Sequence, residues 1–86
     1  MTVDVSGPIR RFVGEEILFQ DPGSVSPDHV LIPGAMDSLA LVRLVAFLEE
    51  EFGVEIDEAE LTAEHFRTVG AIERFAASKT ERAPAG

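Results

Sequence analysis

The stretch Gly34-Ala35-Met36-Asp37-Ser38-Leu39 marks the point where a long connection ends and the most regular helical pattern of the chain begins. Asp37 occupies an N-cap position, because its side-chain oxygen can accept a hydrogen bond from a free backbone N–H of the first turn. Ser38 then falls at the first helical position, with its hydroxyl at the mouth of the helix. Unpaired N–H groups and the positive end of the helix dipole favour an anionic group there. Ser38 is therefore the candidate site for a phosphate-containing group.

The residues that follow predict a helix over residues 38–51, stopped by Gly53 at the C′ position. One apolar stripe is assigned to the core and consists of Leu41, Leu44, Val45, Leu48 and Phe52. A second stripe, displaced round the helix, consists of Leu39, Val42 and Ala46. A surface helix needs only one apolar face, so the second stripe either covers neighbouring loops or forms a partner surface beside Ser38. Phe47 fits either stripe.

Apolar spacing also predicts a first helix over about residues 7–20, with Ser6 as a candidate cap and Asp21-Pro22-Gly23 as the stop. A long connection over residues 21–37 follows. Three consecutive apolar residues lie within it, and at least one of them should reach the core: Val30, Leu31 and Ile32. A loop of this length is usually functional or disordered, and this apolar cluster favours an ordered one.

The second half of the chain predicts an extended connector over residues 54–57 and a single turn over residues 58–61. Thr62 is placed as the cap of a short helix over residues 63–66, and Thr68 as the cap of the last helix, over about residues 68–78. The fold class is therefore all-α: a small four-helix bundle with three main helices, one short helix and a long first connection. Residues 1–86 make a single domain, with its core in about residues 6–79 and a polar tail over residues 80–86 that should fray.

The chain is acidic, with 16 Asp and Glu residues against 7 Lys and Arg residues and a net charge of −9. This charge disfavours nucleic acid and anionic membranes, and it favours partners with basic surfaces. The absence of cysteine excludes disulfides and thiolate chemistry. The first residues do not form a signal peptide, and the longest apolar run, Leu44 to Leu48, is too short to span a membrane. We expect a cytoplasmic monomer.

Neither an enzyme nor a metal site is indicated. A serine hydrolase would place its serine between flanking glycines at a strand-to-helix turn, and Asp37-Ser38-Leu39-Ala40 has neither feature. His29 and His65 lie far from Ser38 in the sequence and are given no role. The acidic residues lack the order of a calcium-binding loop, so they are interpreted as a solvated face that steers basic partners.

The Asp37-Ser38-Leu39 motif, the glycine-containing loop before it, the helix after it and the later Val54-Glu55-Ile56 resemble the acyl and peptidyl carrier proteins over about residues 9–79. The resemblance implies that Ser38, beside Asp37, carries a covalent 4′-phosphopantetheine arm derived from coenzyme A. It further implies a discrete carrier that holds a thioester-bound biosynthetic intermediate. The implied partners are a phosphopantetheinyl transferase, an adenylating ligase or acyltransferase that loads the arm, and a downstream synthase or transferase.

Several residues depart from the carriers of fatty acid synthesis, which tend to have acidic residues where this chain has Ala40 and Arg43. One additional residue also separates Gly34 from Asp37. The segment over residues 60–69 is closer to freestanding carriers of specialised metabolism. The resemblance therefore implies polyketide or nonribosomal peptide biosynthesis, such as that of antibiotics, with an amino acid or short acyl group as cargo.

The expected partner surface lies along the helix that begins at Ser38. It comprises Leu39, Val42, Arg43, Ala46 and Glu49. Within it, Arg43 is expected to select partners that carry an acidic residue at the matching position. The alternative is a helical docking domain without a carrier function, in which Ser38 merely begins a helix.

Overall fold

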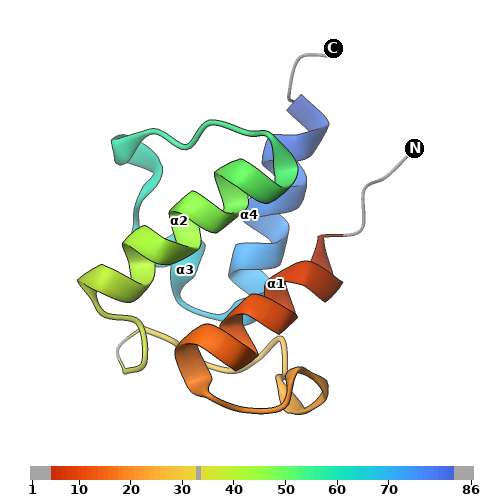
Figure 1. Cartoon of the computed structure of the whole chain (residues 1–86). Helices are drawn as coiled ribbons and strands as arrows, with labels where there is room; N and C mark the ends of the chain where they lie inside the picture. Colours follow the sequence, from red (N-terminus) through yellow and green to blue (C-terminus); the bar gives the residue numbers. More distant parts are fainter. Residues whose placement is uncertain (1–4, 33, 83–86) are drawn as a thin grey trace.

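The computed structural model describes residues 5–32 and 34–82, and its described residues form the helical bundle shown in Figure 1. The helices are α1 (Ser6–Phe12), which continues into the π-helix η1 (Val13–Leu18), then α2 (Ser38–Phe52), α3 (Ala63–Phe66) and α4 (Val69–Arg82). Two short 3₁₀ turns, η2 (Pro22–Ser24) and η3 (Glu58–Glu60), lie in the connections. Within the described ranges, β-type pairing is limited to an isolated bridge between Val30 and Thr68. The prediction of an all-α bundle with one short helix and a long first connection is confirmed.

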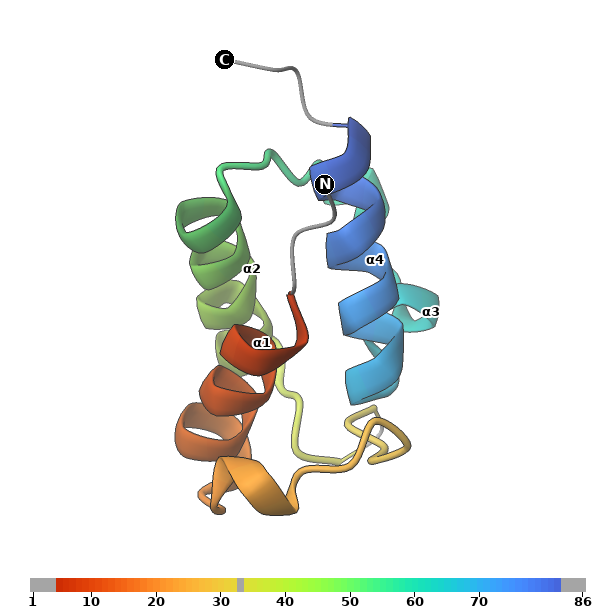
Figure 2. The ribbon, with the colours of Figure 1, turned by 90° about the vertical axis from the view of Figure 1, so that its right-hand side faces the viewer.

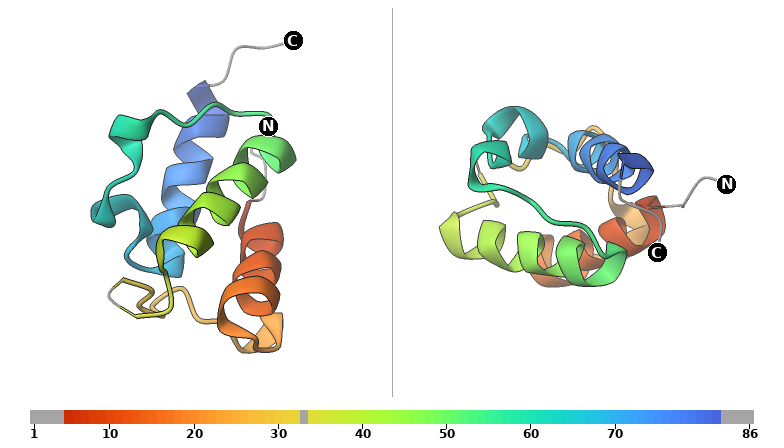
Figure 3. Two further views of the ribbon diagram at one scale, coloured as in Figure 1. Left: turned by 60° about the vertical axis from the view of Figure 1, so that its left-hand side comes forward. Right: turned by 90° about the horizontal axis from the view of Figure 1, so that it is seen from above.

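The helices pack in two groups around one core. α1 and α2 lie side by side and run in roughly opposite directions, while α4 faces them with α3 beside it (Figures 2 and 3). The largest fully buried side chains come from both groups and from the long connection: Phe66, Ile9, Leu31, Leu44, Leu48, Ile72, Val13 and Val69. Leu44 and Leu48 thus occupy the core as predicted, and the other members of their stripe are partly buried and pack against it.

The first helix begins and ends differently from the prediction. Ser6 is its first residue and not its cap; the N-cap is Val5, which makes no side-chain capping bond. Val5 is buried, and its carbonyl accepts the N–H of Ile9 at 3.2 Å. The apolar burial of Val5 therefore fixes the helix start, where the sequence had suggested a hydroxyl cap. The helical segment ends at Leu18, and the C-cap residue that follows, Phe19, adopts a left-handed conformation with φ of 55° and ψ of 47°.

Gly14 explains how the chain turns back at the end of η1. The backbone N–H of Gln20 donates to the Gly14 carbonyl at 2.7 Å. A Cβ at Gly14 would come within 3.0 Å of the Gln20 carbonyl oxygen and within 3.2 Å of both Pro22 Cα and Val25 Cγ2. Although glycine lowers helix propensity, this close approach of the following turn leaves no room for a side chain.

The described residues of the long connection are bonded to the segment that starts α4. The N–H of Leu31 donates to the Arg67 carbonyl at 2.6 Å, and the N–H of Gly70 donates to the Pro27 carbonyl at 2.7 Å. Leu31 is fully buried, so the prediction that at least one residue of the apolar cluster reaches the core is confirmed. Val30, its neighbour, is exposed.

The second half of the chain follows the predicted order of elements. The Thr68 hydroxyl accepts the N–H of Ala71 at 3.0 Å, which confirms it as the cap of α4, whereas Thr62 precedes α3 without a side-chain capping bond. α4 continues to Arg82, so residues 80–82 of the predicted tail are helical, and residues 83–86 lie outside the described residues. Between the predicted end of this helix at residue 78 and Pro84, the sequence contains no glycine or proline. The helix therefore continues for about one more turn.

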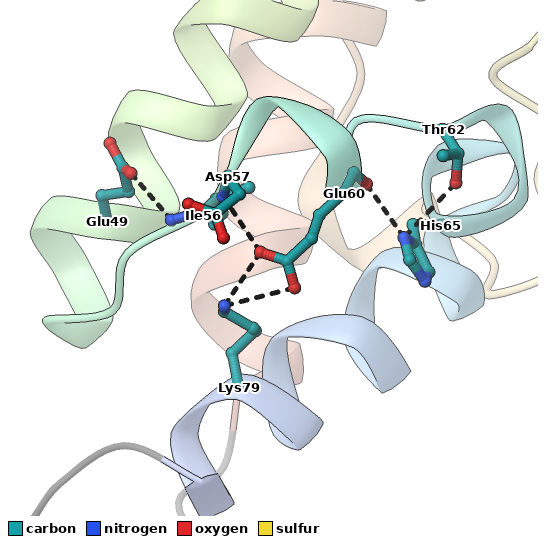
Figure 4. Close-up of polar contacts among 7 residues, drawn as sticks. All are labelled: Glu49, Ile56, Asp57, Glu60, Thr62, His65 and Lys79. Carbon is teal, nitrogen blue, oxygen red and sulfur yellow. Dashed lines mark hydrogen bonds and ion pairs between the residues drawn. The ribbon is translucent and has the colours of Figure 1, made fainter.

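A polar network centred on Glu60 holds η3 against its neighbours (Figure 4). Its carboxylate pairs with Lys79 Nζ at 2.9 Å and accepts the N–H of Asp57 at 2.9 Å. The Glu60 carbonyl lies 2.9 Å from Nδ1 of His65, which must donate because a carbonyl oxygen can only accept. His65 also stacks on Phe75 with ring centroids 4.4 Å apart. His65 thus has a structural role that its sequence position did not reveal.

Candidate functional site at the start of α2

The turn before α2 sets the position of the candidate serine. The N–H of Met36 donates to the Leu31 carbonyl at 3.0 Å, and Gly34 adopts φ of 144°, a region that favours glycine. Leu31 is buried in the core and Met36 packs against it. The additional residue between Gly34 and Asp37 is therefore taken up by a turn whose two ends rest on the core.

Asp37 caps α2 as predicted. Its backbone is extended, and its Oδ1 accepts the N–H of Ala40 at 2.7 Å. The N–H of Leu41 then donates to the Asp37 carbonyl at 2.9 Å and begins the regular helical bonding. Ser38 is the first residue of α2 and is exposed to solvent. The local geometry therefore presents a serine in the open at the positive end of a helix of 15 residues.

These residues fit the group that the resemblance implies. An exposed hydroxyl can be modified by a separate enzyme without any rearrangement of the bundle. The backbone N–H groups of the first turn of α2 favour a phosphodiester at this position. In the described part of the chain no cluster of side chains suited to a metal ion is found. Among the helices described, none is long and apolar enough to cross a membrane.

The second apolar stripe of α2 is not covered by the described loops. Leu39 is 68% exposed and Val42 is 65% exposed, and Ala46 is also exposed. Of the two interpretations that the sequence left open, cover for neighbouring loops is therefore wrong. Phe47 belongs to the packed side of the helix, because its ring stacks on Phe12 with centroids 4.6 Å apart.

Two charged residues of the expected partner surface have contacts within the chain. The guanidinium of Arg43 is paired with the carboxylate of Glu16, and both side chains are nearly half exposed, at 46% and 44%. Glu49 accepts the N–H of Ile56 at 2.9 Å and so holds the connector after α2 (Figure 4). Sequence reasoning missed Glu16, since only packing of η1 against α2 brings it to Arg43.

The chain matches the family described as phosphopantetheine attachment site over residues 9–76. Acyl carrier proteins from two strains of Caulobacter vibrioides are each 40% identical to it over 79 residues, which cover 90% of this chain and 96% of each relative. Among solved structures, holo acyl carrier protein from Nitrosomonas europaea superposes with a TM-score of 0.75 at 27% identity, covering 93% of this chain and all of that one. Apo KstB-PCP, a peptidyl carrier protein, gives a TM-score of 0.75 at 37% identity, covering 90% and 87% of the two chains.

These likenesses confirm the resemblance that the motif around Ser38 suggested, and they do not favour a docking domain without a carrier function. Proteins of this kind are carriers and not catalysts, and their cofactor is covalently attached 4′-phosphopantetheine. The match extends over most of the chain, and the fold agrees with that of the solved carriers. The chain therefore belongs to the phosphopantetheine-binding family of acyl and peptidyl carrier proteins.

Proposed function

We propose that Ser38 bears the 4′-phosphopantetheine arm and that the chain delivers carried acyl or aminoacyl groups between enzymes of a biosynthetic pathway. The observation that carries this proposal is the exposure of Ser38 at the first position of α2, directly after the capping residue Asp37. Attachment forms a bond between Ser38 Oγ and a phosphorus atom of coenzyme A. It breaks the pyrophosphate bond and releases the adenosine bisphosphate part, while the hydroxyl proton passes to the transferase.

The residues of the chain hold and present the arm. Asp37 keeps the first turn of α2 formed through its bond to Ala40, and the positive end of the helix dipole stabilises the negative charge of the phosphodiester. When bound, the arm supplies a terminal thiol that holds the carried group as a thioester. The acidic surface of the chain then favours rapid association with partners that present basic side chains.

The partner surface proposed for delivery lies on the exposed stripe of α2. Leu39 and Val42 supply exposed apolar area beside Ser38, and Ala46 extends it along the helix. Arg43 flanks this stripe, but its pairing with Glu16 means that a partner would have to compete for its charge. Glu49 holds the connector to η3, so of the five proposed partner-surface residues it is the least available for a partner contact.

We further propose a role in specialised metabolism of the polyketide or nonribosomal type, in the cytoplasm, with an amino acid or short acyl cargo. Ala40 and Arg43 support this assignment, because they replace acidic residues expected in carriers of fatty acid synthesis. The similarity to a peptidyl carrier protein supports it as well. Incubation of the arm-bearing protein with a panel of adenylating ligases and acyltransferases should give loading by an amino acid or short acyl enzyme. Loading by long-chain fatty acyl enzymes alone would contradict this assignment.

The attachment itself is tested by intact-mass measurement of the apo protein after incubation with coenzyme A and a promiscuous phosphopantetheinyl transferase. The mass should rise by one phosphopantetheine group in the natural chain and remain unchanged in Ser38→Ala. Circular dichroism of Ser38→Ala controls for its fold. An unchanged mass for the natural chain, or a gain by Ser38→Ala, would overturn the proposal.

A further inference from the structure

Phe19 is the most exposed large apolar residue in the described part of the chain, with 81% of its surface accessible. It follows η1 and precedes the turn at Asp21. An exposed aromatic ring gains little from packing within the molecule. The position of Phe19 therefore needs an explanation outside the core.

The backbone of Phe19 makes an aromatic residue there still less expected. Its φ of 55° and ψ of 47° lie in the left-handed region, where a bulky side chain is strained and glycine or asparagine is favoured. The turn needs this conformation, since the N–H groups of Phe19 and Gln20 both donate to the Gly14 carbonyl. The turn does not need a phenyl ring. The sequence thus keeps an aromatic side chain at a position where the fold alone would prefer another residue.

Phe19 lies at the same end of the molecule as the candidate serine. Glu16 in η1 is ion-paired with Arg43 in the second turn of α2, so η1 passes within side-chain reach of the N-terminal half of α2. The end of η1 and the start of α2 lie at the same end of the bundle in Figures 1 and 2. Phe19 is therefore a further exposed apolar residue, on the neighbouring helix, at the end of the bundle where α2 begins with the exposed Leu39 and Val42.

We infer that Phe19 is an anchor contact for the phosphopantetheinyl transferase that modifies Ser38, an inference that rests on the proposed function. That enzyme must bring its reacting atoms to the serine hydroxyl itself, so it has to cover this end of the bundle. The partners proposed for delivery dock on the exposed stripe of α2 and meet the end of the flexible arm, so they do not need a contact at the end of η1. The matching surface on the transferase is an apolar pocket for the ring, with a basic side chain that faces the exposed Glu15.

The test compares kcat/KM for attachment, measured by intact mass with coenzyme A and a promiscuous phosphopantetheinyl transferase, between the natural apo protein and Phe19→Asn. Asparagine accepts the left-handed conformation and removes the ring. We expect kcat/KM to fall by about fivefold or more, through a raised KM, as for truncation of an aromatic anchor. The urea midpoint of Phe19→Asn should equal or exceed that of the natural chain. Phe19→Trp should retain most of the natural kcat/KM.

Val30→Asn is the matched control, because Val30 is another exposed apolar residue but belongs to the loop bridged to Thr68. It should leave kcat/KM unchanged. A kcat/KM for Phe19→Asn within about twofold of the natural value would overturn the inference. So would equal losses in Phe19→Asn and Val30→Asn, or a loss accompanied by a lowered urea midpoint. Failure of the proposed function would differ from all of these, since the natural chain would then gain no mass.

Discussion

The backbone N–H of Gly70 donates a hydrogen bond to the carbonyl of Pro27 at 2.7 Å, so the long connection lies directly on the first turn of α4. A Cβ at Gly70 would come within 3.0 Å of that carbonyl oxygen and within 3.5 Å of Pro27 Cβ. Together with the bond from Leu31 to Arg67, this contact holds the loop that leads to Asp37. The position of the candidate site therefore depends on residues some thirty positions farther along the chain.

Gly70→Ala should lower the free energy of unfolding by about 1–3 kcal/mol, because the new methyl group overpacks against the backbone of Pro27. This loss should exceed the gain in helix propensity, which is at most about 1 kcal/mol. Urea denaturation followed by circular dichroism measures the change. A variant more stable than the natural chain would show that the loop moves away from α4 at little cost.

Gly14→Ala and Gly7→Ala form a matched pair in the first helical segment. A Cβ at Gly14 meets three atoms within 3.2 Å, two of them backbone, whereas a Cβ at Gly7 meets nothing within 4 Å. Gly7→Ala should therefore stabilise the protein by about 0.5–1 kcal/mol, and Gly14→Ala should destabilise it by about 1–3 kcal/mol. Thermal and urea unfolding of the two variants provide the comparison. Changes of the same sign would contradict the close approach seen at Gly14.

Leu48→Ala should cost about 2–5 kcal/mol of unfolding free energy, because its side chain is fully buried between the helices. In a domain of 86 residues this is a large part of the total stability, so the measurement should begin from low urea concentrations. Val42→Ala is the control on the same helix and should change stability by no more than about 0.5 kcal/mol, since Val42 is 65% exposed. A loss below about 1 kcal/mol in Leu48→Ala would mean that the core face of α2 is misassigned.

Asp37→Ala should lower the free energy of unfolding by about 0.5–2 kcal/mol, since it removes the acceptor for the Ala40 N–H. Asp37→Asn should retain most of this energy, because an amide oxygen also accepts the bond. Hydrogen exchange at Ala40 gives a local measurement, with faster exchange expected in the alanine variant alone. Equal protection of that amide in both variants would argue against the cap.

The Arg43–Glu16 pair should contribute at most about 1 kcal/mol, because both side chains are nearly half exposed and screened by solvent. A double-mutant cycle with Arg43→Ala and Glu16→Ala isolates this coupling energy, which should shrink as salt is added. A coupling energy well above 1 kcal/mol at high salt would show that the pair is shielded more than its exposure suggests.

The helix caps and helix ends that depend on neighbouring residues in the sequence could be predicted from the sequence. The Asp37 cap, the start of α2, its end at Gly53 and the Thr68 cap each depend on residues within one turn of the position concerned. The core face of α2 followed from helical spacing, with Leu48 at its centre.

Features that depend on distant contacts were not predictable in the same way. The π-helical end of the first helix and the left-handed Phe19 arise where Gly14 meets the turn at Pro22. The pairing of Arg43 requires Glu16 to be brought alongside by tertiary packing. Spacing within one segment carries no information about such neighbours. Two residues of the expected partner surface, Arg43 and Glu49, therefore proved to have contacts within the chain.

The bond from Leu31 to the Arg67 carbonyl has a consequence for the order of events during biosynthesis. Residues 31–38 are synthesised before residues 67–70, so the loop has nothing to hold it in its final shape until that later segment has also emerged and folded. The loop that positions Ser38 reaches its final shape only when α4 begins to form. We therefore expect a chain truncated before residue 67 to be a poor substrate for phosphopantetheine attachment, although it keeps Asp37 and Ser38. We also expect attachment in the cell to follow folding.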